Sequence, residues 1–332
     1  MVKLATAAGA AIPRTCAVVE DNGLLDLQAA HISLIGVPAP EFSTMHNLIE
    51  AGDHALDLAR TIIARAEGRI EPERLADTRL LAPVPEPVQM RDALCFELHC
   101  LQSFAKAREL RAARSPDPAA EMREMEERGI LRVPDEFYKF PLYYKQNRFS
   151  VSGPGDDIHW PGYSDVMDYE LEIGIFIGRS GINIPRDRAL DHVFGYTIFN
   201  DFSARDAQFA EQGGSLGPCK GKDFKGANAI GPWIVTADEV PDPYDLEMIV
   251  RVNGEERGRG SSSTMHWRFE DVIARISEDE EIRAGEFIGS GTVGNGSGLE
   301  RMQFLHHGDV VELEIEQLGV LRNRVVRRQE IS

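Results

Sequence analysis

The chain has 332 residues, with 36 Lys and Arg against 54 Asp and Glu, so its formal net charge is −18. This excess of negative charge repels phosphate backbones and anionic lipids, so neither a nucleic acid nor a membrane is the expected partner. A hydrophobic fraction of 42% is enough for a folded core and excludes global disorder. Because a domain uses about 100–200 residues, we expect two domains.

The beginning of the sequence does not resemble a signal peptide. Residues 1–13 contain one lysine and a short Ala-rich stretch, without the charged start and long apolar run of an export signal. No uninterrupted apolar run approaches the roughly 18 residues of a membrane span. The four cysteines have no CxxC spacing, which is typical of reduced thiols. We therefore expect a cytoplasmic protein.

Residues 1–86 are predicted to form a small N-terminal α+β domain. Strands are expected over 15–20 and 23–27, joined at the turn Asn22-Gly23. A helix is expected over 44–67, where apolar residues recur with helical spacing. The stretch Leu81–Pro87 contains three prolines at alternate positions, which favours an extended linker. The domain boundary is therefore placed after residue 86.

Residues 87–332 are predicted to be mainly β. Strand-like runs cover 169–177, 230–236, 246–252 and 310–316, and the last alternates apolar and acidic residues as a half-buried strand does. Short helices are expected over 186–193 and 266–276. The charged segment 103–132 contains two helical stretches separated at Pro116 and Pro118. Two interpretations of this segment stay open, a mobile lid over a site and a solvated insertion with no gating role.

Two glutamates lie inside the apolar run 169–177. In a strand, residues two apart point to the same face, so Glu170 and Glu172 are expected to project together. Two like charges beside a core need a cation, a shared proton or open solvent. Taken alone, such a pair more often forms a solvated face, which is the interpretation of the glutamates in the 310–316 strand.

Two aspartates strengthen the case for a metal site. Asp201 closely follows the apolar run 193–199, and Asp92 follows the proline-rich linker. Three or four converging carboxylates would suit a hard cation such as Mg²⁺, Mn²⁺ or Ca²⁺. Zinc would require His and Cys ligands at paired spacing, and the sequence has no such pattern. Asp92, Glu170, Glu172 and Asp201 are therefore candidate metal ligands.

Six short motifs occur in an order that is typical of one protein family. They are Arg91-Asp92 followed by His99, Asp168-Tyr-Glu-Leu-Glu172, the segment from Gly195 to Asp206, Gly221-Lys-Asp-Phe224, Gly231-Pro-Trp233, and Gly289-Ser-Gly-Thr-Val-Gly294. Each motif alone is weakly specific, but together they resemble the fumarylacetoacetate hydrolase family from about residue 88 to the C-terminus. The resemblance implies a fumarylacetoacetase-type β-roll catalytic domain, mixed but mainly β, behind the small N-terminal domain, and a homodimer.

The resemblance also implies a catalytic pair. By similarity, the four carboxylates hold the metal and His99 is the general base. The partner that orients His99 is a late glutamate in the founding fumarylacetoacetase type, and Glu300 falls at the matching place. Shorter family members use a glutamate three residues after the histidine, where this chain has Gln102. Glu300 is therefore the expected partner of His99.

The remaining implied residues surround the substrate. Arg205, Gln208 and Lys222 match residues near the substrate oxygens and the activated water, and Tyr144 and Thr292 match substrate-contacting positions.

Two positions depart from the pattern of fumarylacetoacetase. Leu94 and Gln212 stand where fumarylacetoacetase has substrate-binding tyrosines, which weakens any case for fumarylacetoacetate itself as the substrate. The expected reaction is hydrolytic cleavage of a carbon–carbon bond in a small diketo acid or acylpyruvate-like compound. The metal would stabilise an enolate, and His99 with Glu300 would activate water.

Other functions stay open at this point. A decarboxylase, isomerase or hydratase of the same family would use the same metal site without water attack, and the pair of His99 and Glu300 favours hydrolysis. A catalytically silent binding module would keep the metal site for structure or ligand sensing. A cupin-like oxygenase is disfavoured because its paired-histidine strand motif is missing.

Overall fold

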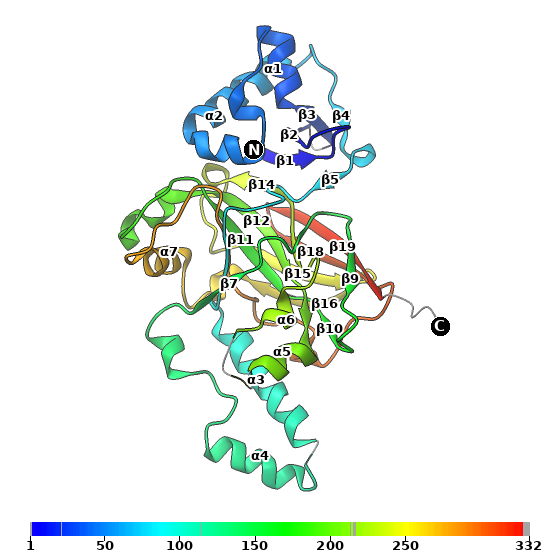
Figure 1. The fold of residues 1–332 in the computed structure, drawn as a ribbon, viewed down its shortest axis with the longest axis vertical. Helices are drawn as coiled ribbons and strands as arrows, with labels where there is room; N and C mark the ends of the chain where they lie inside the picture. The colour runs from blue at the N-terminus through cyan, green and yellow to red at the C-terminus, as the bar shows by residue number, and fades with distance from the viewer. Residues whose placement is uncertain (1, 21, 114, 213, 215–216, 328–332) are drawn as a thin grey trace.

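The computed structural model describes residues 2–20, 22–113, 115–212, 214 and 217–327, and one large sheet runs through them (Figure 1). Within the described residues this sheet has twelve strands. In the order in which they pair, they are β4 (Glu73–Arg74), β3 (Gly23–Asp26), β2 (Arg14–Val19), β1 (Lys3–Ala7), β14 (Asn228–Thr236), β12 (Val193–Asp201), β11 (Leu171–Ile177), β17 (Phe287–Gly289), β6 (Met90–Ala93) and β7 (Tyr143–Gln146), with β5 (Leu80–Leu81) beside β1 and β8 (Val151–Ser152) beside β14. The mixed fold with large sheets agrees with the predicted fold class.

A second sheet packs against the first and closes the main core. Its five strands are β16 (Glu255–Ser261), β15 (Glu247–Val252), β18 (Val310–Ile315), β19 (Gly319–Arg327) and β9 (Asp157–Trp160). The predicted alternation in β18 is confirmed, because Val311, Leu313 and Ile315 are buried while Val310 and the glutamates between them are partly exposed. Buried residues of β11 and β12 form one hydrophobic cluster with those of β15 and β18. A short pair, β10 (Met167–Asp168) and β13 (Ser203–Ala204), lies beside the site described below.

Helices cover the two ends of the molecule. The α-helices are α1 (Leu27–Ile35), α2 (Met45–Ala66), α3 (Glu97–Ala112), α4 (Pro118–Glu127), α5 (Arg205–Gln212), α6 (Cys219–Lys222) and α7 (Phe269–Ser277). The 3₁₀ turns are η1 (Pro40–Phe42), η2 (Leu75–Asp77), η3 (Asp135–Tyr138), η4 (Arg186–His192), η5 (Ala237–Glu239), η6 (Ser262–Thr264) and η7 (Leu299–Arg301). In Figure 1, α1 and α2 lie at one end and the α3–α4 hairpin projects from the other. Among the described residues, no helix combines the length and apolar character needed to cross a membrane.

The N-terminal strands belong to the same large sheet as the strands of the later part of the chain. Strand β1 pairs with β14, with Lys3 opposite Val235. Leu4 and Phe42 share a hydrophobic cluster with Phe176 of β11 and Phe287 of β17. Residues 1–86 therefore share both a sheet and a core with the rest of the chain. The proposed boundary after residue 86 stays a prediction.

Candidate active site

Three carboxylates from three strands of the large sheet converge. Asp92 lies on β6, Glu172 on β11 and Asp201 at the end of β12, and their oxygens lie within 4.8 Å of one another. All three side chains are buried. The N–H of Gly291 donates to Asp92 Oδ1 at 3.0 Å and to Glu172 Oε2 at 2.9 Å. Oδ1 of Asp201 is buried without a hydrogen-bond partner. Facing oxygens and one unsatisfied acceptor fit a hard divalent cation.

The crowding of these carboxylates disfavours their charged forms. Burial raises the pKa of Asp92 to about 6 and, despite the nearby ammonium group of Lys222, that of Asp201 to about 7. Burial and the charges of both aspartates raise the pKa of Glu172 well above its usual range. A bound dication would take the place of the protons and remove the repulsion. The acidic cluster is therefore suited to a metal ion rather than to a solvated surface.

These raised pKa values predict a pH-dependent effect of metal on stability. A carboxyl group whose pKa is higher in the folded chain than in the unfolded chain stabilises the fold at low pH and loses that effect as the pH rises through the folded value. The metal-free protein should therefore lose the stabilisation that comes from its protonated carboxyl groups between about pH 4 and about pH 7. Over the same range metal affinity should increase, because fewer protons compete with the metal for the carboxylates. We expect the metal-induced rise in melting temperature to grow from about pH 5 to about pH 8. A rise that is constant or falls over this range in calorimetric scans would contradict the assignment.

Glu170 lies beside the acidic cluster and is engaged with two cations. Arg205 Nη2 is 2.7 Å from Glu170 Oε1, and Lys222 Nζ contacts Glu170 Oε2. Burial alone would raise the pKa of Glu170, but the positive charges of Arg205 and Lys222 outweigh it, so the pKa is lowered. Lys222 Nζ also lies 2.5 Å from Asp201 Oδ2. Lys222 thus connects Glu170 to the three converging carboxylates, and a ligand role for Glu170 stays a prediction.

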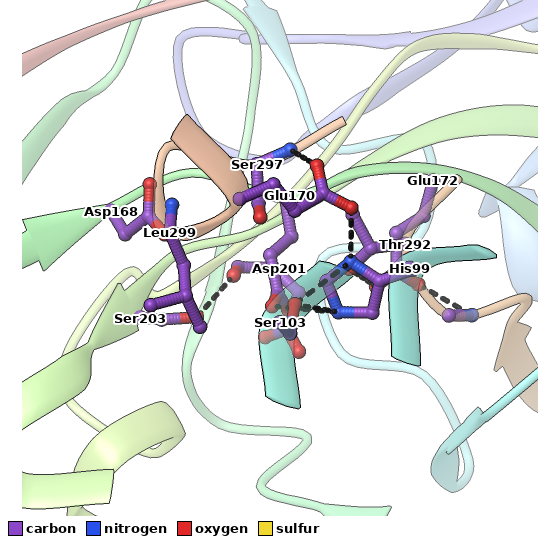
Figure 2. A network of polar contacts seen from close by, with 12 residues as sticks. His99, Ser103, Asp168, Glu170, Glu172, Asp201, Ser203, Thr292, Ser297 and Leu299 are labelled. Carbon is purple, nitrogen blue, oxygen red and sulfur yellow. Dashed lines mark hydrogen bonds and ion pairs between the residues drawn. The ribbon is translucent and has the colours of Figure 1, made fainter. Parts of the chain in front are cut away.

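The first turn of α3 places a histidine against a buried glutamate. His99 Nδ1 lies 2.8 Å from Glu300 Oε1, and the other oxygen of Glu300 accepts the N–H of Ser297 at 2.9 Å. A carboxylate can only accept, so Nδ1 carries the proton and Nε2 is an acceptor, with the Ser103 hydroxyl 3.4 Å from it. Nε2 lies 3.9 Å from Glu170 Oε1. Figure 2 shows His99 beside the carboxylates of the site. This arrangement is that of a general base with an orienting partner.

The alternative partner of His99 has a different role. Gln102 and Asn295 bind each other reciprocally, with Gln102 Nε2 donating to Asn295 Oδ1 at 2.8 Å and Asn295 N donating to Gln102 Oε1 at 3.1 Å. This pair ties α3 to the loop that leads to η7. The structure therefore brings Glu300 to His99 and directs the side chain of Gln102 elsewhere.

The other expected residues are also brought to this place. Tyr144 donates to Asp201 Oδ2 at 2.9 Å, and the hydroxyl of Thr292 lies 3.4 Å from Glu172 Oε1. Gln208 accepts from Arg205 Nη1 at 2.9 Å. Asp201 and Glu300 are not among the residues that line a cavity of about 310 Å³ at this place. Nine of the expected residues line it: Asp92, His99, Tyr144, Glu170, Glu172, Arg205, Gln208, Lys222 and Thr292.

Asp168 has a positioning role that the sequence reasoning did not assign. Its side chain is fully buried. Oδ1 accepts the N–H of Gly298 at 2.8 Å, and Oδ2 accepts the N–H of Leu299 at 2.9 Å and Nε of Arg205 at 2.8 Å. Asp168 therefore holds both the turn that carries Glu300 and the guanidinium beside Glu170. The sequence feature that could have indicated this role is the position of Asp168 two residues before Glu170 in the same motif.

Gly289 leaves room for the carboxylates to approach each other. A Cβ at this position would lie 2.7 Å from Asp92 Oδ1 and 2.9 Å from Glu172 Oε2. We expect Gly289→Ala to weaken metal binding at least about tenfold and to destabilise the fold by about 1–3 kcal/mol, because overpacking moves the ligands. Titration calorimetry with Mg²⁺ or Mn²⁺ measures the effect. Gly162→Ala is the matched control because an added Cβ there meets open space, and an equal loss in both variants would contradict the explanation.

One family model matches most of the chain. The model described as fumarylacetoacetate (FAA) hydrolase C-terminal covers residues 113–326. This range contains Glu170, Glu172, Asp201 and Glu300, whereas Asp92 and His99 precede it.

Curated and solved relatives agree with this match. An uncharacterised protein of Staphylococcus epidermidis is 40% identical over 182 residues, which are 54% of this chain and 59% of that protein. The match thus spans less than two thirds of that relative. The solved fumarylacetoacetate hydrolase of Exiguobacterium antarcticum has a TM-score of 0.71 at 26% identity, covering 99% of this chain and 100% of that one. A maleylpyruvate hydrolase of Sphingobium sp. SYK-6, solved with manganese(II) and pyruvate, has a TM-score of 0.69 at 22% identity over 98% and 100% of the two chains.

Proposed function

Because this chain belongs to the fumarylacetoacetate hydrolase family, we propose that it is a divalent-metal-dependent hydrolase of a diketo acid or acylpyruvate-like substrate. The observation that carries this proposal is the pairing of His99 with Glu300 beside three converging carboxylates. Mg²⁺ or Mn²⁺ is the proposed cofactor, and breakdown of small oxo acids is the proposed role. A homodimer and a cytoplasmic location stay predictions.

Asp92, Glu172 and Asp201 would hold the cation, with Glu170 as the predicted fourth ligand. The unpartnered Oδ1 of Asp201 and the raised pKa values of Asp92 and Asp201 support this assignment. When bound, a divalent cation would act as a Lewis acid toward two oxygens of an oxo acid. The manganese of the Sphingobium protein belongs to a relative whose similarity shows the fold alone, so the proposal rests on the carboxylates of this chain.

His99 would provide the base for water attack. Its Nε2 can take a proton from a water molecule while Glu300 holds the opposite nitrogen and stabilises the imidazolium. The water oxygen then bonds to the acyl carbonyl carbon. The bond from that carbon to the neighbouring methylene breaks, and its electron pair stays on the methylene, which takes up a proton. The products are a carboxylic acid and a smaller oxo acid.

Lys222 and Arg205 would balance charge during this reaction. Both side chains are buried and both line the cavity. Their contacts with Glu170 hold one cation on each side of this carboxylate. Fixed positive charges in a site that excludes water stabilise oxygen atoms that gain negative charge in the transition state.

Cleavage in ¹⁸O-labelled water tests the proposal. Purified protein with Mg²⁺ or Mn²⁺, or with a chelator, is incubated with a panel of acylpyruvates, and both products are identified by mass spectrometry. We expect metal-dependent release of pyruvate and one ¹⁸O atom in the carboxylic acid. Isomerised or decarboxylated product without cleavage would overturn the hydrolase assignment and favour the other activities of the family.

A further inference from the structure

The cavity beside His99 is lined by two chemically different sets of residues. Helix α3 runs along it, with His99 in the first turn at the carboxylates. Phe104 and Ala107, on the same helix, also line the cavity. Ala107 lies eight residues after His99, which is about 12 Å along a helix axis. The cavity therefore extends well beyond the space needed for two chelating oxygens and a water molecule.

Part of the cavity lining is an apolar wall. We use this name for six of the lining residues: Leu94, Phe104, Ala107, Leu131, Leu142 and Phe209. Three of them, on three different segments, pack against a small buried cluster of Cys100, Val133 and Phe137. Packing against this cluster supports the wall from behind, which lowers the cost of ordering its side chains when an apolar group binds.

Among the described residues, the apolar wall offers no Arg or Lys side chain that could pair with a second carboxylate of a substrate. Within the described residues, Arg205 and Lys222 are the Arg and Lys side chains that line the cavity, and both are engaged with Glu170. Arg108 follows Ala107 on α3, but its Nη1 donates to the carbonyl of Leu131 at 2.5 Å and it does not line the cavity. A carboxylate against this wall would lose part of its hydration without gaining a charged partner, which is unfavourable.

We propose that the substrate is a diketo acid whose acyl end is uncharged and apolar, and that the apolar wall binds this end. The inference rests on the proposed function and adds the class of acyl group. Phe104 is a specificity-determining residue in this arrangement, because it belongs to both the wall and its supporting cluster. Gln208 and Gln212, which also line the cavity, offer hydrogen bonds but no charge to neutralise a carboxylate.

Two acylpyruvates of equal chain length test the inference, one ending in a methyl group and the other in a carboxylate. Pyruvate release is followed with lactate dehydrogenase at saturating Mg²⁺. We expect the methyl-ended compound to have the higher kcat/KM, by at least about tenfold. A preference of the unchanged protein for the dicarboxylate would overturn the inference. If Arg108→Gln then removed that preference, Arg108 would be the group that reaches the cavity.

A charge placed in the wall should reverse the order of the two substrates. Phe104→Arg adds a guanidinium at a helical position that tolerates arginine well. We expect this variant to gain at least about tenfold in relative kcat/KM for the dicarboxylate. Phe104→Leu is the matched control and should keep the preference for the methyl-ended compound. Circular dichroism and melting temperature show that each variant is folded, and an unchanged order in folded Phe104→Arg would count against the wall.

A binding measurement separates failure of this inference from failure of the proposed function. If neither compound is cleaved, the hydrolase proposal fails, and the shift in melting temperature caused by each compound with Mg²⁺ still tests the wall. A larger shift with the methyl-ended compound supports the apolar acyl end. An equal or larger shift with the dicarboxylate overturns it.

Discussion

Replacing His99 by glutamine should lower the rate of diketo acid cleavage about 10²–10⁴-fold, the usual contribution of a positioned general base. Glutamine can still donate a hydrogen bond to Glu300 but cannot accept a proton from water at physiological pH. Since His99 lies outside the three converging carboxylates, metal affinity should stay unchanged. Steady-state kinetics gives the loss in kcat, and titration calorimetry gives the metal affinity.

An exposed histidine provides the control for this experiment. The side chain of His306 is 87% exposed, and His306→Gln should keep full activity. A His99→Gln variant that binds metal and cleaves substrate at the unchanged rate would exclude His99 as the base. The site would then need another group to activate water, and the isomerase and decarboxylase alternatives would gain support.

Replacing Glu172 by glutamine should abolish metal binding and yet stabilise the metal-free protein. Glu172 is fully buried between Asp92 and Asp201, and its raised pKa reflects burial together with their repulsion. At a pH above the raised pKa of Glu172, where its carboxyl group is ionised in the metal-free protein, a neutral amide removes one of three competing charges. At such a pH we expect the metal-free melting temperature to rise by about 1–2 °C, equivalent to about 1 kcal/mol for a chain of this size. Metal affinity should fall by at least about a hundredfold, and cleavage should fall with it.

A surface glutamate separates this local effect from a change in overall charge. Glu316, at the exposed end of the second sheet, loses the same charge in Glu316→Gln. This control should keep the metal-induced rise in melting temperature, whereas Glu172→Gln should lose it. If both variants keep the rise in scanning calorimetry with Mn²⁺, Glu172 is not a ligand. If Glu172→Gln melts at a lower temperature than the unchanged metal-free protein, the carboxylates are not in repulsion.

The sequence was sufficient to locate the acidic residues of the site but not to divide their roles. The spacing of Glu170 and Glu172 predicted only that both project to one face, and the family resemblance implied that both belong to a metal site. Both side chains are buried. Their different partners depend on tertiary structure, because Arg205 and Lys222 come from helices that are distant in sequence and contact only Glu170 of the two. Asp168 was missed for a similar reason, since its role depends on backbone N–H groups some 130 residues away.

Secondary structure was predicted best where the local sequence pattern was strongest. The helix predicted over 44–67 is α2, and the hairpin at Asn22-Gly23 joins β2 to β3. Helix α1 was not predicted, because its sequence Leu27–Ile35 is apolar on nearly every side and lacks the contrast that reveals a helix. Its first turn is capped by Asp26, which accepts the N–H of Ala29 at 2.9 Å. The two helices expected around Pro116 and Pro118 are α3 and α4, whereas the movement of a lid stays a prediction.

The pairing of β1 with β14 limits how this protein can be dissected. Strand β14 also pairs with β12, which ends at Asp201. Expression of residues 87–332 alone would leave the β1 side of β14 as an open edge and uncover Phe176 and Phe287, which now pack against N-terminal side chains. Open edges and bare apolar faces promote self-association. A truncated catalytic fragment is therefore a poor reagent, and the first strand is a structural support for the acidic site rather than a removable appendage.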